Sequence, residues 1–84
     1  MELLISGGGL RELCTKHDFL TAHNIPHSMS GGIYPCLRGE ENIKEGLKVL
    51  ARVPFWRKDF IYEFQKYKVF PDEVIEGFRK SKLW

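Results

Sequence analysis

The sequence predicts a small α+β fold, in which a β-α-β-β-α unit is followed by two further helices. Short apolar runs bounded by glycine or proline indicate strands, and apolar residues spaced three and four apart indicate helices. The chain has 84 residues, a length that suits one domain. We therefore expect a single domain over residues 1–84, made of a βαββα unit (1–51) and an aromatic, basic helical extension (52–84).

The first strand and the first helix are separated by a triple glycine. Residues 2–6 form a short apolar run that ends at glycines 7–9, so we expect a buried strand there. A helix is expected over residues 10–24, because a residue that precedes a proline is biased away from the helical region and Pro26 lies just beyond. This helix is expected to turn Leu10, Leu13, Cys14, His17 and Leu20 to the core and to pair Glu12 with Lys16 on the other face.

A hairpin and a second helix complete the first unit. The extended segments 27–29 and 33–37 flank a Ser-Gly-Gly turn, which is typical of a hairpin. Pro35 cannot donate a ladder hydrogen bond, so we expect its strand at a sheet edge or irregular. Gly39 then opens a helix with an apolar stripe and an i,i+4 ion pair: the stripe is Ile43, Leu47 and Leu50, and the pair is Glu40 with Lys44.

Two helices are expected in the remainder of the chain. Pro54 separates the second helix from an aromatic helix over residues 55–68, and Pro71 suits the first turn of a fourth helix. In the third helix Trp56, Phe60, Phe64 and Tyr67 recur at helical spacing. Phe60 and Phe64 are expected in the core, whereas Trp56, at the entrance of the helix, is expected to stay exposed. The fourth helix is expected to turn Val74, Ile75 and Phe78 inward and to pair Glu76 with Lys80.

The first unit carries a family resemblance. The features that match are the opening strand at residues 2–6, the helix-to-strand turn at residues 19–26 and the helix at residues 40–50. Residues 1–51 resemble the small prokaryotic signal-transducing proteins built on a half-ferredoxin-like βαββα unit. The resemblance implies a regulatory or binding module with no established catalytic site. The triple glycine and residues 52–84 depart from the pattern of that family.

Charge and aromatic residues are distributed unevenly between the two parts. Residues 1–51 carry five Lys or Arg against six Asp or Glu, whereas residues 52–84 carry eight against five and hold nine of the eleven aromatic residues. No apolar run approaches the ~20 residues that a membrane helix needs, and two cysteines are too few for a disulfide framework. We therefore expect a cytoplasmic protein with no membrane partner.

The aromatic, basic third of the chain is the leading candidate for a functional surface. Exposed Trp and Tyr are typical anchors of protein interfaces, and an open sheet edge can pair with another chain. We expect a non-enzymatic regulator or inhibitor, of the kind found among accessory and phage-encoded genes, that binds another protein or also a second copy of itself. The expected partner-binding residues are Trp56, Arg57, Tyr62, Arg79 and Trp84.

The alternative interpretation is a nucleic-acid-binding protein. The last two predicted helices have the order of a helix-turn-helix, and basic residues follow Phe78, so they could contact phosphates. The first turn of the fourth helix would meet the bases, and it carries negative charge at Asp72, Glu73 and Glu76. This acidity argues against binding to DNA.

Three further patterns could carry chemistry, and each has a simpler explanation. Cys14, His17, His27 and Cys36 are four candidate zinc ligands, but their spacing matches no known zinc motif. Cys14 and His17 could form a nucleophile and base, and Gly8, Gly9 and Arg11 could bind an anion at a helix start, although the residues of a nucleotide loop are missing. We therefore expect no catalytic residue, no metal and no cofactor.

Overall fold

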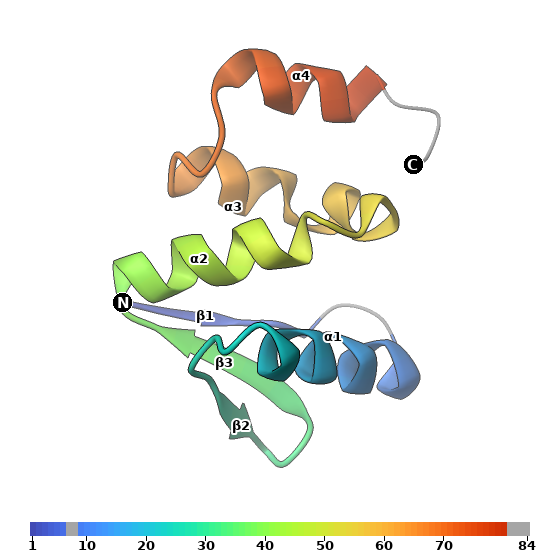
Figure 1. Ribbon diagram of the computed structural model, residues 1–84, viewed down its shortest axis with the longest axis vertical. Coiled ribbons are helices and arrows are strands. Elements are labelled where there is room, and N and C mark those ends of the chain that lie inside the picture. The colour runs from blue at the N-terminus through green and yellow to red at the C-terminus, as the bar shows by residue number, and fades with distance from the viewer. Residues whose placement is uncertain (7–8, 81–84) are drawn as a thin grey trace.

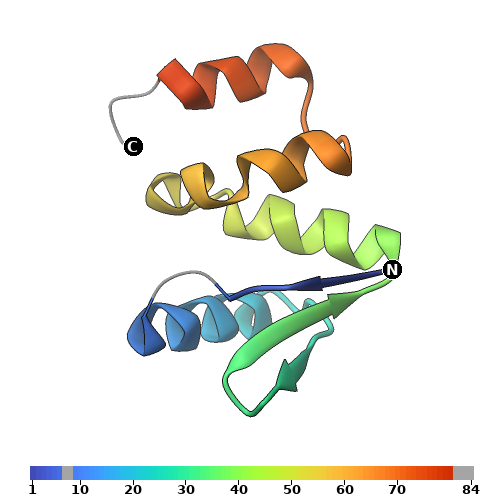
Figure 2. The same cartoon turned by 180° about the vertical axis from the view of Figure 1, so that it is seen from behind.

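The computed structural model describes residues 1–6 and 9–80 and confirms the α+β fold (Figure 1). The sheet and α1 lie at one end of the molecule, α4 lies at the other, and α2, η1 and α3 lie between them (Figures 1 and 2). The elements in chain order are β1 (Glu2–Leu4), α1 (Leu10–Ala22), β2 (Ser28–Ser30), β3 (Tyr34–Arg38), α2 (Glu40–Leu50), the 3₁₀ helix η1 (Pro54–Phe60), α3 (Ile61–Lys66) and α4 (Asp72–Lys80).

The three strands form an antiparallel sheet in the order β1-β3-β2. The expectation that Pro35 lies on an edge strand is wrong, because β3 is the central strand and Pro35 is buried within it. The Pro35 carbonyl accepts a hydrogen bond from the Ile5 N–H at 2.9 Å, just after the end of β1. The N–H that proline lacks would therefore point toward β1, just beyond the last residue of that strand. It would not point toward β2, so its absence leaves the pairing between β3 and β2 intact.

The register separates the two faces of the sheet. Leu3 lies opposite Leu37, and this pair faces the core, where Leu37 is fully buried. Helices α1 and α2 pack against each other and against β3. A Cβ atom added at Gly46 in α2 would lie 2.6 Å from Leu37 Cδ1, so α2 approaches the sheet closely at this glycine. Glu2 and Arg38 lie opposite each other on the other face and form an ion pair at 3.2 Å.

Helix α1 ends two residues earlier than expected, and its predicted buried face is confirmed only in part, at Leu13 and Leu20. The residues that it buries are Leu13, Lys16 and Leu20. Leu10 and Cys14 are exposed, so the prediction that they face the core is wrong. Lys16 does not pair with Glu12 at the surface, because its side chain is fully buried and its ammonium lies 4.0 Å from the Asp59 carboxylate. A lysine thus occupies the position that the pattern assigned to solvent.

Helix α2 is as predicted. Ile43, Leu47 and Leu50 are fully buried, and Glu40 and Lys44 form the expected ion pair at 3.8 Å. Gly39, which precedes the helix, has a φ of 88°, a conformation that glycine adopts without strain. The turn from β3 into α2 therefore depends on this residue.

The aromatic segment is not one α-helix. Residues 54–60 form the 3₁₀ helix η1 and only residues 61–66 are α-helical, because Phe60 at the junction leaves the helical region with φ −122° and ψ 14°. The predicted burial of Phe60 and Phe64 is confirmed nonetheless, and Trp56 and Tyr67 lie in the core with them.

Helix α4 packs on this segment, but it buries fewer of its residues than predicted. Ile75 is buried and Phe78 is half-buried, with its ring centroid 5.9 Å from that of Phe64. Val74 is exposed, so its predicted burial is wrong. Glu76 lies 3.9 Å from Arg79, so the surface pair forms at i,i+3. Across residues 1–6 and 9–80, no helix has both the length and the apolar character that a membrane span requires.

Candidate protein-binding surface

Among the described residues of the C-terminal third, two aromatic side chains face solvent. Phe55 is 57% exposed and Tyr62 is 70% exposed, whereas Phe64 and Tyr67 belong to the core. From η1 to the residue that follows α3, the buried positions are 56, 60, 64 and 67, and the exposed positions are 55, 58, 59, 62, 65 and 66. The segment therefore packs one side on the core and leaves two large rings on the other.

Lysines accompany these rings on the solvent side. The Lys58 ammonium lies 4.9 Å from the centroid of the Phe55 ring, and Lys66 is exposed one turn after Tyr62. We call Phe55, Lys58, Tyr62 and Lys66 together the outer surface of η1 and α3. Its composition, large rings with cationic side chains, is suited to a partner that offers apolar contact and negative charge.

Trp56 does not belong to this surface. Its side chain is 6% exposed, and its ring stands edge-on to Phe19 of α1, with the centroids 5.8 Å apart. The expectation that Trp56 is exposed at the start of its helix is therefore wrong. The first turn of η1 directs the indole toward α1, where it also lies 5.6 Å from the Lys16 ammonium.

Arg57 and Arg79 make contacts within the molecule. The Arg57 Nε donates a hydrogen bond to the Ala51 carbonyl at 2.8 Å, and its guanidinium lies 4.7 Å from the centroid of the Phe78 ring. Arg57 therefore joins the end of α2, η1 and α4, which is a structural role. Arg79 pairs with Glu76 at the surface of α4. Trp84, the fifth expected contact residue, lies outside the described residues.

A buried cation beneath η1 was missed by the sequence reasoning. The Lys16 ammonium lies 5.3 Å from the Phe60 ring centroid and 4.0 Å from Asp59, and a pocket of about 250 Å³ at this place is also lined by Glu63. Desolvation by burial raises the pKa of Glu63 above its ordinary value, although its own backbone and Lys66 lower it in part. Lys16 and Asp59 are 43 positions apart, so spacing along the chain could not show their contact.

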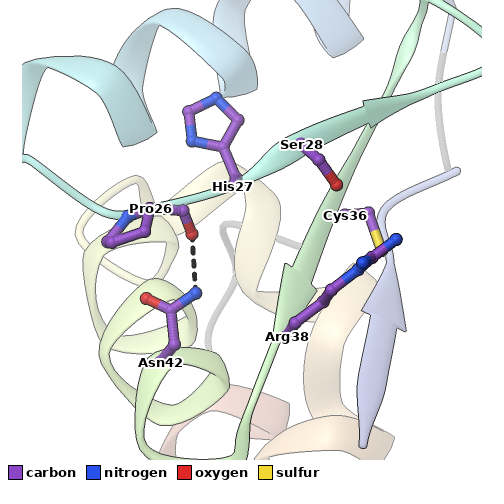
Figure 3. Close-up of a pocket in the computed structure, with 6 residues that line it drawn as sticks. All are labelled: Pro26, His27, Ser28, Cys36, Arg38 and Asn42. Atoms are coloured by element: carbon purple, nitrogen blue, oxygen red, sulfur yellow. Dashed lines mark hydrogen bonds between the residues drawn. The ribbon is translucent and has the colours of Figure 1, made fainter.

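A second pocket, of about 260 Å³, lies beside the hairpin (Figure 3). The Asn42 amide donates to the Pro26 carbonyl at 2.6 Å. His27 Nδ1 lies 2.7 Å from the Ile25 carbonyl, which can only accept, so Nδ1 carries the proton. The lining residues are Pro26, His27, Ser28, Cys36, Arg38 and Asn42.

The groups in this pocket are not arranged for nucleophilic catalysis. Figure 3 shows the His27 ring pointing away from the Cys36 sulfur, so the imidazole is not placed to take a proton from the thiol, as activation of a nucleophile requires. Arg38 is held by Glu2 across the sheet. The pocket therefore presents a thiol and a guanidinium on one strand without an adjacent base.

The four candidate zinc ligands of the sequence are brought together only in part. The His17 and His27 rings lie edge-on with centroids 4.7 Å apart, Cys14 is exposed on α1, and Cys36 is buried in the central strand. The expectation that Cys14 packs as a core thiol beside His17 is wrong. In the part of the chain that the structure describes, no three His, Cys, Asp or Glu residues are placed to hold a metal ion.

The residues weighed as a possible anion site are described only in part. The Gly9 carbonyl accepts the first hydrogen bond of α1, from the Leu13 N–H at 3.0 Å, and Arg11 is exposed. Gly8 lies outside the described residues. Gly9 therefore has the ordinary role of a residue that precedes a helix.

Comparison of the chain with known protein families, characterised proteins and solved structures finds no match. A functional hypothesis must therefore rest on the molecule's own surfaces.

Proposed function

We propose that this chain is a small, non-enzymatic regulator or inhibitor that binds another protein through the outer surface of η1 and α3. The observation that carries the proposal is the exposure of Phe55 and Tyr62 on a segment whose other side supplies much of the core. Phe55 and Tyr62 therefore take the place of three of the contact residues expected from the sequence, Trp56, Arg57 and Arg79. Trp56 and Arg57 make contacts inside the molecule, and Arg79 lies on α4.

Energetics support a binding role for these rings. Burying a large apolar side chain contributes about 1.5–3 kcal/mol. Because Phe55 and Tyr62 are mostly exposed in the folded chain, most of this free energy can still be gained when a partner covers them. Tyrosine is enriched among the residues that dominate protein interfaces. Lys58 and Lys66 add positive charge at the rim, so the partner expected is a protein with an acidic, partly apolar patch.

Single-stranded nucleic acid is the second candidate, because aromatic rings flanked by lysines can stack on bases and contact phosphates. The helix-turn-helix alternative has less support. Helix α3 has six residues, and α4 begins with Asp72 and Glu73, which would place negative charge at the turn that meets the base edges.

The test is capture from a lysate of the native host by the immobilised chain, before and after nuclease treatment and at two salt concentrations. The double variant Phe55→Ala, Tyr62→Ala should lose the captured protein, while Val74→Ala, which shortens an exposed apolar side chain on α4, should retain it. Both variants should melt near the parent temperature, because the residues replaced are exposed. Capture that persists in the double variant would contradict the proposed surface.

Salt and nuclease separate the two candidates. Phosphate contacts release counterions, so binding to nucleic acid falls steeply with salt, and nuclease treatment would abolish it. Binding to protein through apolar contacts would change little. A captured species that disappears with nuclease would replace the leading proposal by the second.

A further inference from the structure

The hairpin lies in an uncharged part of the chain. No Asp, Glu, Lys or Arg occurs between Asp18 and Arg38, although 29% of all residues are charged. Within this stretch Met29 and Ile33 are each 39% exposed. Strand β2 is an edge strand, and no other described element lies along its outer side in Figures 1 and 2. An uncharged strand edge that carries one exposed apolar side chain, Met29, therefore faces solvent.

The hydrogen-bond pattern of the sheet shows which backbone groups of β2 point away from β3. The Ile5 N–H donates to the Pro35 carbonyl and the Gly39 N–H donates to the Met1 carbonyl, so Pro35 points its carbonyl toward β1. Hydrogen bonding alternates between the two sides along a strand. Met29 lies opposite Pro35, and its N–H and C=O must therefore point away from β3, out of the sheet. Ser28 and Ser30 instead turn their backbone groups toward β3.

We propose that β2 pairs with β2 of a second copy of this chain, antiparallel about Met29, and joins two three-stranded sheets into one of six strands. In this arrangement the Met29 N–H of each copy donates to the Met29 carbonyl of the other, and Ser28 lies opposite Ser30. The contact is the same on both sides, as a two-fold axis requires.

A second copy fits this edge better than an unrelated strand does. Natural edge strands are commonly protected from each other by lysine, proline or a bulge, and β2, with the sequence Ser-Met-Ser, has no charged residue or proline. Because the stretch around it is uncharged, two copies can approach without like charges meeting. The exposed Met29 side chains would cover each other beside the two-fold axis. Since β2 has three residues, the pairing is expected to be reversible and dependent on concentration.

The test is sedimentation equilibrium of the full chain from about 10 µM to about 1 mM, a range that spans weak reversible association. The parent should move from monomer toward dimer as concentration rises. Met29→Pro should weaken dimerisation at least tenfold with an unchanged circular dichroism spectrum, because the N–H that it removes points out of the sheet and proline is tolerated at such positions. A parent that stays monomeric throughout would overturn the proposal.

A second variant keeps the test decisive if proline disturbs the hairpin. Met29→Lys places two like charges beside the two-fold axis and should also weaken dimerisation at least tenfold. Val74→Lys is the matched control, because it adds the same charge at a residue of similar exposure, 38% against 39%, on α4. Dimerisation that survives Met29→Lys, or that Val74→Lys weakens equally, would place the contact elsewhere. The double variant Phe55→Ala, Tyr62→Ala should dimerise like the parent, which separates this inference from the proposed function.

Discussion

The Lys16 ammonium lies 4.0 Å from the Asp59 carboxylate, and this contact joins α1 to η1 beneath the surface of the molecule. The lysine is fully buried, whereas the aspartate is 38% exposed. The rings of Trp56 and Phe60 lie within 5.6 Å of the same ammonium. A single cation therefore contacts the parts of η1 that pack on the first helix.

We expect Lys16→Met to unfold at the same denaturant concentration as the parent or a higher one. Removing one partner of a buried ion pair is destabilising when the other charge stays buried, but Asp59 is 38% exposed and can be hydrated when Lys16 is replaced, while the methionine side chain keeps the apolar contacts. Lys16→Ala should instead lose about 2–5 kcal/mol, as expected when a large buried side chain is truncated. Urea denaturation compares the three proteins. A Met variant as unstable as the Ala variant would mean that the ammonium itself is required.

The contact between α2 and β3 gives a second prediction, on Gly46. Alanine favours a helix by up to about 1 kcal/mol over glycine, but a Cβ atom at Gly46 would lie 2.6 Å from Leu37 Cδ1 and 3.3 Å from Leu37 Cδ2. Leu37 is fully buried, so it cannot move into solvent, and overpacking costs about 1–3 kcal/mol. We expect Gly46→Ala to lower the free energy of unfolding by up to about 2 kcal/mol.

Gly77 in α4 is the matched control for this substitution. A Cβ atom added at Gly77 meets nothing within 4 Å, so Gly77→Ala should raise the melting temperature through helix propensity alone. If both substitutions stabilised the protein, the close approach of α2 to the sheet would be wrong.

The aromatic core gives a third prediction. Phe64 is fully buried and contacts the rings of Phe60, Phe70 and Phe78. Phe64→Ala should cost about 3–5 kcal/mol, which is a large part of the stability of a small domain. Tyr62→Ala, two positions away on the solvent side, should change stability by less than about 0.5 kcal/mol. Thermal melts followed by circular dichroism compare them, and a reversed order would invalidate the assignment of the two faces.

The sequence predicted most of the fold because its local patterns agree with the final packing. The apolar stripe of α2, the glycine-containing turn of the hairpin and the burial of Phe60 and Phe64 each depend on residues close in the chain. The turn itself lies one residue later than predicted, because Ser30 belongs to β2. The edge position assigned to Pro35 was wrong because the local rule does not consider where β1 ends, and the ladder to β1 stops opposite Pro35.

The errors at the candidate surface have a common physical origin. Lys16 was assigned to solvent and Trp56 to a partner, yet each is buried in contact with the other. A lysine is rarely buried without a charged partner, and its partner Asp59 is remote in sequence. The exposure of Tyr62 could be anticipated from its position between the buried residues Phe60 and Phe64. The exposure of Phe55 depends on the 3₁₀ geometry of η1, which buries the neighbouring Trp56.

The last prediction concerns Glu63 and pH. Burial raises the pKa of Glu63 above its ordinary value of 4.5, so between these two values the folded chain binds more protons than the unfolded chain. The contribution of Glu63 to stability is therefore present at pH values below 4.5 and is lost as pH rises through the raised pKa. Lys16 and Asp59 line the same pocket and remain in place in the variant Glu63→Gln. We expect Glu63→Gln to be more stable than the parent at neutral pH and to lose this part of the pH dependence. Urea denaturation at a series of pH values measures the stability difference and its pH dependence. NMR titration of the Glu63 carboxyl in the parent measures the pKa directly, and a carboxyl that titrates below 4.5 would contradict the argument.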